Sequence, residues 1–129
     1  MVPENAETFS TLVLGASCKA GRFSYLAIKS LVKHGVRVYA IGSRPCFVDG
    51  VQVHAEKINL TNLHTVTLYL NSQNQTTYYD YILSLKPKRI IFNPGAENPE
   101  LVRLAHENRI DYVFGCTLVM LNDGSFFKS

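Results

Sequence analysis

The stretch at residues 11–22 constrains the fold of this chain more than any other part of the sequence. Its first residues, TLVL, are largely apolar, and they stop at Gly15 before the short loop ASCKAG and a segment with helical spacing from Phe23 onward. A glycine at the end of a strand permits a tight turn, and the small Ala16 and Ser17 let a ligand approach the main chain. The following helix would point unpaired N–H groups at the loop, an arrangement that suits an anion. The pattern predicts a strand, a phosphate-binding loop and a helix, although an ordinary strand-to-helix connection remains an alternative.

Apolar, β-rich segments alternate with helical spacing along the rest of the chain. The first helix is expected to stop at Gly35, a later one ends at Lys86-Pro87, and Asn98 can cap another that begins with Pro99-Glu100. Further strands are expected at residues 36–41, 51–53, 66–70, 89–92 and 111–114, with a loop at 42–50. Strands separated by helices imply a parallel sheet covered on both faces. We expect an α/β protein with a Rossmann-like three-layer α/β/α sandwich and a mostly parallel sheet.

Composition bounds the class of protein. The 129 residues, 47% hydrophobic and 18% charged, fit one globular domain over residues 1–129, with residues 1–10 as an N-terminal extension. A net charge of +3 without a basic run interleaved with aromatics argues against nucleic acid, and no apolar run reaches the roughly 20 residues of a membrane helix. Three cysteines without metal-ligand spacing, and a start without a signal-peptide pattern, lead us to expect a cytoplasmic protein that holds no metal.

Ligands of such sheets bind beyond the carboxyl ends of the strands, where the strand order reverses. The loops to consider are those at Gly15, Gly42, Asn71 and Pro94. If the first strand is central and the strand at residues 66–70 is its other neighbour, the crevice lies between the Gly15 and Asn71 loops.

The end of the second expected strand discriminates between ligands. A NAD-binding domain usually places Asp or Glu there, to accept hydrogen bonds from the ribose. This chain has Ile41-Gly42-Ser43-Arg44 instead. The guanidinium fork of Arg44 suits a phosphorylated ribose, which both NADP and coenzyme A carry. Arg44 as a solvated loop residue is the competing interpretation.

Several segments together resemble a known family. They are VLGAS at residues 13–17, GRFSY at 21–25, VRVYAI at 36–41 and GVQV at 50–53, and the likeness extends over residues 11–121. They look like the small stand-alone CoA-binding proteins, whose domain is similar to that of the succinyl-CoA synthetase alpha subunit. Gly15, Ser17, Arg22, Ser24 and Tyr25 match the family's loop and helix start, whereas Gly42-Ser43 replaces its Asn-Pro.

The resemblance implies a site for CoA or an acyl-CoA. The pyrophosphate would lie at the backbone of residues 15–17, with Lys19 or Arg22 as its charge partner and Ser17 or Ser24 as a donor. Ser43 and Arg44 would face the ribose phosphate. The adenine would lie along Leu70 and Asn71, and the pantetheine arm would run toward the small residues of the Pro94-Gly95-Ala96 turn and toward Asn98. The expected ligand-contacting residues are Gly15, Ala16, Ser17, Lys19, Arg22, Ser24, Tyr25, Gly42, Ser43, Arg44, Asn71, Pro94, Gly95 and Ala96.

Some of these side chains have a second interpretation. Tyr25 fits helix packing as well as a ligand contact, and Cys18 fits a small loop residue as well as a reactive thiol. Cys116 would lie at the ligand's thiol end or pack in the core. No catalytic constellation emerges, so we expect a CoA-binding carrier, sensor or subunit. An NADP-binding reductase or redox sensor and a ligand-free interaction module are the alternatives, and a protein partner or second copy is left open.

Overall fold

The computed structural model describes residues 3–128 and shows a single seven-stranded sheet between two layers of helices. The strand order is β3-β4-β2-β1-β5-β6-β7, and every neighbouring pair is parallel except β3 and β4. The strands are β1 (Thr11–Ala16), β2 (Val38–Gly42), β3 (Cys46–Val48), β4 (Val51–His54), β5 (Thr65–Leu68), β6 (Arg89–Phe92) and β7 (Asp111–Phe114). The expected Rossmann-like α/β class is confirmed.

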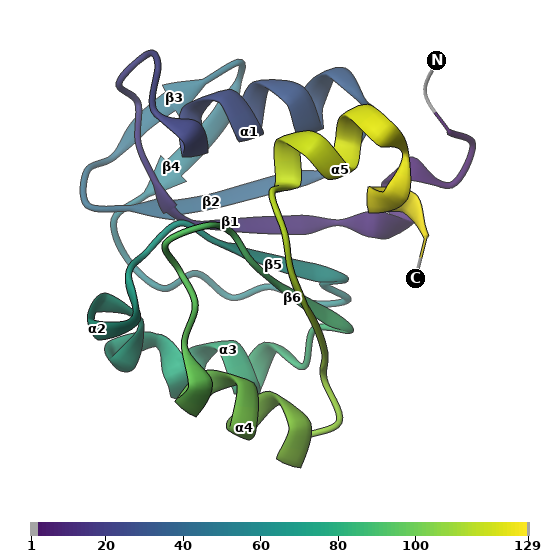
Figure 1. Ribbon diagram of the computed structural model, residues 1–129. Coiled ribbons are helices and arrows are strands. Elements are labelled where there is room, and N and C mark those ends of the chain that lie inside the picture. Colours follow the sequence, from purple (N-terminus) through teal and green to yellow (C-terminus); the bar gives the residue numbers. More distant parts are fainter. Residues whose placement is uncertain (1–2, 129) are drawn as a thin grey trace.

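The helices divide between the two faces of the sheet (Figure 1). Helices α1 (Phe23–Lys33) and α5 (Thr117–Asp123) cover one face, and α3 (Tyr79–Leu85) and α4 (Pro99–Glu107) cover the other. The short α2 (Ser72–Gln75) lies beyond the end of β5, and 3-10 turns occupy Ala6–Phe9, Thr76–Tyr78 and Ser125–Phe127. Alternating residues of β1 pack in two separate hydrophobic cores. Leu12 and Leu14 lie on the side of α3 and α4, and Val13 lies on the side of α1. A parallel sheet buried in this way requires apolar residues on both sides of its central strand.

The chain turns in opposite directions on the two sides of β1. The β1–α1–β2 unit steps toward one edge, whereas β5–α3–β6 and β6–α4–β7 step toward the other. The strand order therefore reverses between β1 and β5, as expected if the first strand is central. Ligands of open parallel sheets bind at such a reversal.

Local sequence explains where the helices begin and end. The Asn98 side chain accepts hydrogen bonds from the backbone N–H groups of Glu100 and Leu101, at 3.1 and 3.3 Å, so it caps α4 as predicted. Helix α1 stops at Gly35, which has a positive φ of 79°. Helix α3 stops at Lys86, directly before Pro87. These ends confirm the signals in the sequence.

The structure also corrects parts of the expected map. Residues 46–48, assigned to a loop, form the antiparallel β3, and α5 was not expected at all. Phe23 begins both the expected helical spacing and α1, but its side chain is 69% exposed and does not pack in the core. Strand β5 ends at Leu68, so residues 69–70 lie beyond the sheet rather than within it.

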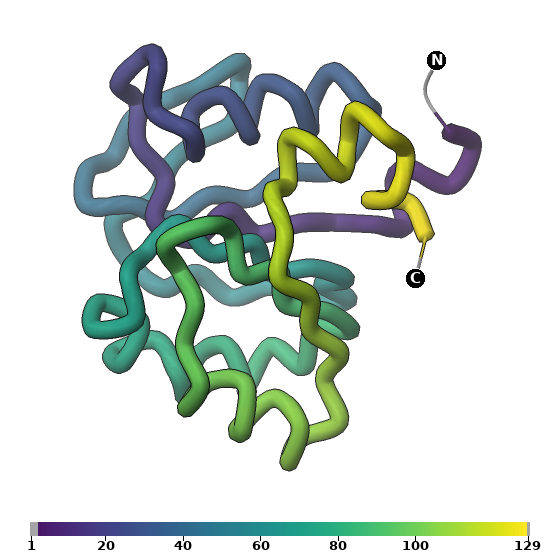
Figure 2. The backbone as a smooth tube through the Cα atoms, in the orientation of Figure 1, coloured from purple at the N-terminus to yellow at the C-terminus, as the bar shows by residue number. Residues whose placement is uncertain are grey.

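The segment expected as an N-terminal extension packs on the domain where the structure describes it. Ala6 and Phe9 are buried, and the Phe9 ring lies 6.2 Å from that of Phe126 and 5.4 Å from that of Phe127. Figure 2 shows the N-terminal and C-terminal segments of the described chain on the same side of the molecule. Residues 1, 2 and 129 of the expected domain lie outside the described residues. Within residues 3–128, no helix is both long and apolar enough to span a membrane.

Candidate ligand-binding site

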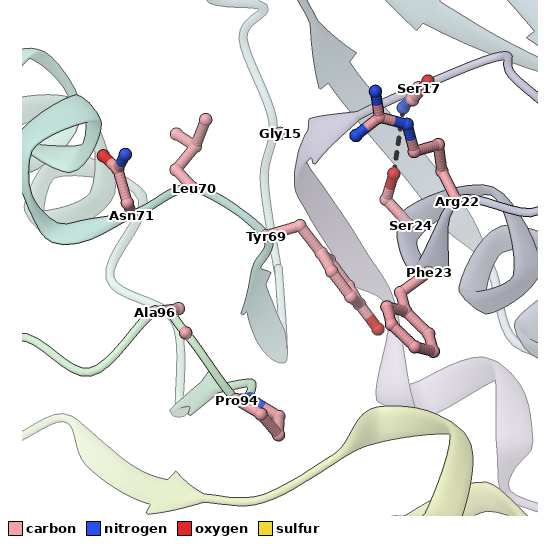
Figure 3. A pocket seen from close by; sticks show the side chains of 11 residues that line it. Gly15, Ser17, Arg22, Phe23, Ser24, Tyr69, Leu70, Asn71, Pro94 and Ala96 are labelled. Atoms are coloured by element: carbon pink, nitrogen blue, oxygen red, sulfur yellow. Dashed lines mark hydrogen bonds between the residues drawn. The ribbon is translucent and has the colours of Figure 1, made fainter.

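A pocket of about 260 Å³ opens at the point where the strand order reverses (Figure 3). Three segments form it, namely the loop after β1 with the start of α1, the residues after β5, and the turn after β6. Its lining residues are Gly15, Ser17, Arg22, Phe23, Ser24, Tyr69, Leu70, Asn71, Pro94, Gly95 and Ala96. The crevice expected between the Gly15 and Asn71 loops is therefore present, and eight of the expected site residues line it.

Gly15 brings the β1 and β5 segments together at the floor of this pocket. Its φ is +96°, and a β-carbon on it would lie 2.9 Å from the carbonyl carbon of Tyr69 and 3.0 Å from Leu70 Cγ. The Tyr69 N–H donates to the carbonyl of Leu14 at 2.8 Å, which holds the two segments at this spacing. Only glycine combines this backbone conformation with so close an approach.

The start of α1 faces the pocket without a cap. Arg22 occupies the N-cap position, makes no capping hydrogen bond, and is followed by no acidic residue in the first turn. The Ser24 hydroxyl instead accepts a hydrogen bond from the Ser17 N–H at 3.0 Å, which folds the loop over the helix start. Ser, Thr, Asp or Asn normally stabilises this end of a helix, and a basic residue there opposes the helix dipole. The arrangement suits a bound anion, which would accept hydrogen bonds from the N–H groups and pair with the guanidinium.

A buried glutamine joins the other two walls of the pocket. The Gln75 amide donates to the carbonyls of Leu70 and Ala96, both at 2.8 Å, and its oxygen accepts from Asn98 at 2.9 Å. Asn98 also donates to the Tyr79 hydroxyl and caps α4, so all of the hydrogen-bonding groups of its buried side chain have partners inside the protein. Sequence reasoning missed Gln75, because two of its three partners, Ala96 and Asn98, are more than 20 residues away.

Aromatic side chains form the apolar part of the site. Tyr69 and the exposed Phe23 lie next to each other in Figure 3, between the loop after β1 and the turn at Pro94. Burial raises the pKa of the Tyr69 hydroxyl to about 12. Neither residue was expected at the site. The pocket thus combines a cationic, hydrogen-bonding end with an apolar wall, as sites for organic phosphates require.

Comparison with known proteins decides the family. A family model described as "CoA binding domain" matches residues 10–122. The chain belongs to this CoA-binding domain family. The comparison with curated proteins found no matching sequence.

Solved structures agree with this CoA-binding domain fold. A crystal structure of an uncharacterized protein is 48% identical, covers 90% of this chain and 96% of its own, and has a TM-score of 0.87. A hypothetical protein from Pyrococcus horikoshii OT3 is 20% identical over 90% of this chain and 82% of its own, with a TM-score of 0.80. The dinucleotide-forming acetyl-coenzyme A synthetase 1 of Ca. Korarchaeum cryptofilum, in complex with phosphate and ADP, is 17% identical over 85% of this chain and 27% of its own, with a TM-score of 0.66. The resemblance read from the sequence is confirmed.

Six of the expected site residues of this CoA-binding domain do not line the pocket. Tyr25 packs, half-buried, against the core beneath α1, with Lys29 Nζ 5.7 Å from its ring centroid, and Lys19 is exposed at the loop tip. Gly42 is buried against the carbonyl of Ala16, where a β-carbon would clash. The remaining three of these six residues are Ala16, which is buried, and Ser43 and Arg44, which are exposed in the loop after β2.

The cysteines differ from the expectation of unpaired thiols. Cys18, in the loop after β1, forms a disulfide with Cys46 at the start of β3, while Cys116 is free. The pair was not predicted from the odd number of cysteines, because sequence spacing does not show which residues lie close together in the fold. The cysteine content therefore no longer supports the expected reducing compartment. Among residues 3–128, no group of three or more His, Cys, Asp or Glu side chains is placed to hold a metal ion.

Proposed function

We propose that this CoA-binding domain binds CoA or an acyl-CoA at the pocket between β1 and β5. The observation that carries the proposal is the uncapped, basic start of α1, which opens into a pocket where the strand order reverses. The pyrophosphate would accept hydrogen bonds from N–H groups of the loop after Gly15 and of the helix start, with Arg22 as the charge partner. Family membership supports the choice of CoA among phosphate-bearing ligands.

The rest of the ligand would extend in two directions. The adenine would lie along Leu70 and Asn71, and the pantetheine arm would pass the small residues Gly95 and Ala96. A pocket of about 260 Å³ encloses only part of such a ligand, so the ribose phosphate would lie outside it, toward Ser43 and Arg44. We propose that the domain acts through binding, as a carrier, a sensor or a subunit of a larger assembly.

Calorimetric titration with acetyl-CoA tests the proposal. Replacing Arg22 with Ala removes a charge-assisted hydrogen bond, which is worth about 1.5–3 kcal/mol, so the Kd should rise roughly 10- to 100-fold. Arg37→Ala is the matched control, because Arg37 is also an exposed arginine but precedes β2 at the opposite end of the strands. No heat of binding with acetyl-CoA or CoA would refute the proposal. An equal loss of affinity in both variants would refute the role of Arg22.

Parallel titrations separate the alternatives. Tighter binding of NADPH than of acetyl-CoA would favour the reductase or redox sensor, and no response to any of these ligands would favour an interaction module.

Comparing CoA with dephospho-CoA, which lacks the ribose phosphate, tests the role of Arg44. If Arg44 pairs with that phosphate, Arg44→Ala weakens CoA but leaves dephospho-CoA unchanged.

A further inference from the structure

A covalent bridge joins the proposed phosphate loop to the neighbouring β3–β4 hairpin. Cys18 and Cys46 are 28 residues apart in sequence, and their Cα atoms are 6.4 Å apart. Cys18 directly follows Ser17, which lines the pocket, and Cys46 lies two residues after Arg44 on the other side. The bridge therefore spans the region between the proposed pyrophosphate and ribose-phosphate contacts.

Little else holds the tip of this loop. Residues 19–22 are exposed, and their sequence, KAGR, contains no apolar side chain larger than that of alanine. The loop's hydrogen bonds stay within the loop and the helix start, from the N–H groups of Ser17, Lys19 and Arg22. Among residues 3–128, no hydrogen bond joins residues 18–21 to residues 43–46. Within the described residues, the disulfide is therefore the direct tie between the loop tip and residues 43–46.

The other end of the bridge is firmly attached. Strand β3 pairs with β4 through Val48 and Val51, and Asp49 in the turn between them lies 2.9 Å from Lys29 Nζ of α1. Figure 1 shows this hairpin next to α1, close to the loop after β1. Breaking the sulfur–sulfur bond would leave the hairpin in place and release the loop.

We propose that Cys18 and Cys46 form a reversible thiol–disulfide site that sets the affinity of the neighbouring pocket for its ligand. The proposal rests on the proposed function, since the ligand is the acyl-CoA assigned to that pocket. In the oxidised protein the loop is held in its binding conformation. In the reduced protein the loop must be ordered when the ligand binds, and binding is weaker because part of the binding free energy offsets that loss of entropy.

The chemistry requires a dithiol as the reductant. One thiolate of the dithiol attacks a protein sulfur, the Cys18–Cys46 bond breaks, and the other cysteine leaves as a thiolate that takes up a proton. The second thiolate of the reagent then attacks its own sulfur in the mixed disulfide and releases the remaining cysteine. Two electrons and two protons pass to the protein, and the reagent becomes a cyclic disulfide. Both cysteines are only half-buried, so the reagent has access to them.

Calorimetric titration of acetyl-CoA into oxidised and reduced protein tests the proposal. The reduced sample is treated with dithiothreitol and desalted without oxygen, and a thiol-counting reagent should find one thiol before reduction and three after it. If the ligand must order the backbone of one more residue in the reduced protein than in the oxidised protein, the Kd should rise about tenfold on reduction. Cys18→Ser/Cys46→Ser should bind as weakly as the reduced protein in both conditions. Cys116→Ser, the matched control, should respond to reduction as the unmodified chain does.

Hydrogen exchange separates failure of the switch from failure of the proposed function. In the protein without ligand, reduction should speed amide exchange in residues 18–22 and leave exchange in the strands unchanged. Equal Kd values in the two states, three thiols in the oxidised protein, or unchanged exchange in the loop would each overturn the switch while leaving acetyl-CoA binding intact. Absence of acetyl-CoA binding in both states would overturn the proposed function, and with it the control of that ligand.

Discussion

Replacing Gly15 with Ala tests whether the close approach of β1 and β5 shapes the pocket. The left-handed backbone at this position costs a residue with a β-carbon about 1–2 kcal/mol. The added methyl group would also lie 2.9–3.0 Å from backbone atoms of Tyr69, and relieving that overlap costs about 1–3 kcal/mol more. The backbone cannot simply move away, because the hydrogen bond from the Tyr69 N–H to Leu14 fixes it. We therefore expect Gly15→Ala to lower the free energy of unfolding by about 2–5 kcal/mol.

Urea denaturation followed by circular dichroism measures this loss, and Gly21→Ala separates its two parts. Gly21 has a similar φ of +91°, but nothing lies within 4 Å of the position of its β-carbon. Only the backbone term of about 1–2 kcal/mol applies there. For a domain with an m-value of about 2 kcal/mol/M, Gly15→Ala should move the midpoint by roughly 1–2.5 M and Gly21→Ala by less than about 1 M. Equal shifts would show that the contact with Tyr69 does not constrain the loop.

Two further variants address the frame of the pocket and the opposite end of the sheet. Gln75→Leu should lower the free energy of unfolding by about 2–4 kcal/mol and weaken acetyl-CoA binding, because it leaves the Ala96 carbonyl and the Asn98 amide without their partner. A urea midpoint within about 0.3 M of that of the unmodified chain would contradict this role. Burial, with a smaller contribution from Arg89, lowers the pKa of His64 from 6.5 to about 4, so the unfolded state takes up the proton first as the pH falls. The contribution of His64 to the free energy of unfolding should be constant above pH 6.5 and fall between pH 6.5 and pH 4. His64→Gln should therefore reduce the pH dependence of stability measured by urea unfolding over this range. An unchanged pH profile in this variant would contradict the role of His64.

The order of the central elements followed from local patterns in the sequence. Strands β6 and β7 have the predicted bounds, and the ends of α1 and α4 were indicated by Gly35 and Asn98. Strand β3 was not, because its three residues stand between Pro45 and Gly50 and gain their conformation from pairing with β4. Helix α5 was missed for a similar reason. Its Thr117 N–H is satisfied by the side chain of Asn93, 24 residues away.

The site was predictable where the chain itself makes the geometry. Gly15, Ser17 and Arg22 belong to one continuous loop, so their neighbourhood could be inferred from spacing alone. Tyr69 was assigned to the end of a strand, whereas β5 stops at Leu68 and the following residues turn along the pocket. Phe23 illustrates the opposite error. Helical periodicity reports which residues share a face but not what that face meets. Phe23, in the first turn of α1, lines the pocket instead of packing in the core.

The start of α1 links the stability of the fold to the proposed binding. Arg22 stands where a small polar residue would stabilise the helix by about 1 kcal/mol, and no acidic residue in the first turn offsets the dipole. A helix end of this kind is a local weakness in the empty protein and becomes favourable when an anion is bound. Arg22→Ser would supply the missing cap, so it should stabilise the empty protein while weakening its affinity for acetyl-CoA. If the two quantities instead changed in the same direction, the start of α1 would serve the fold and not the ligand.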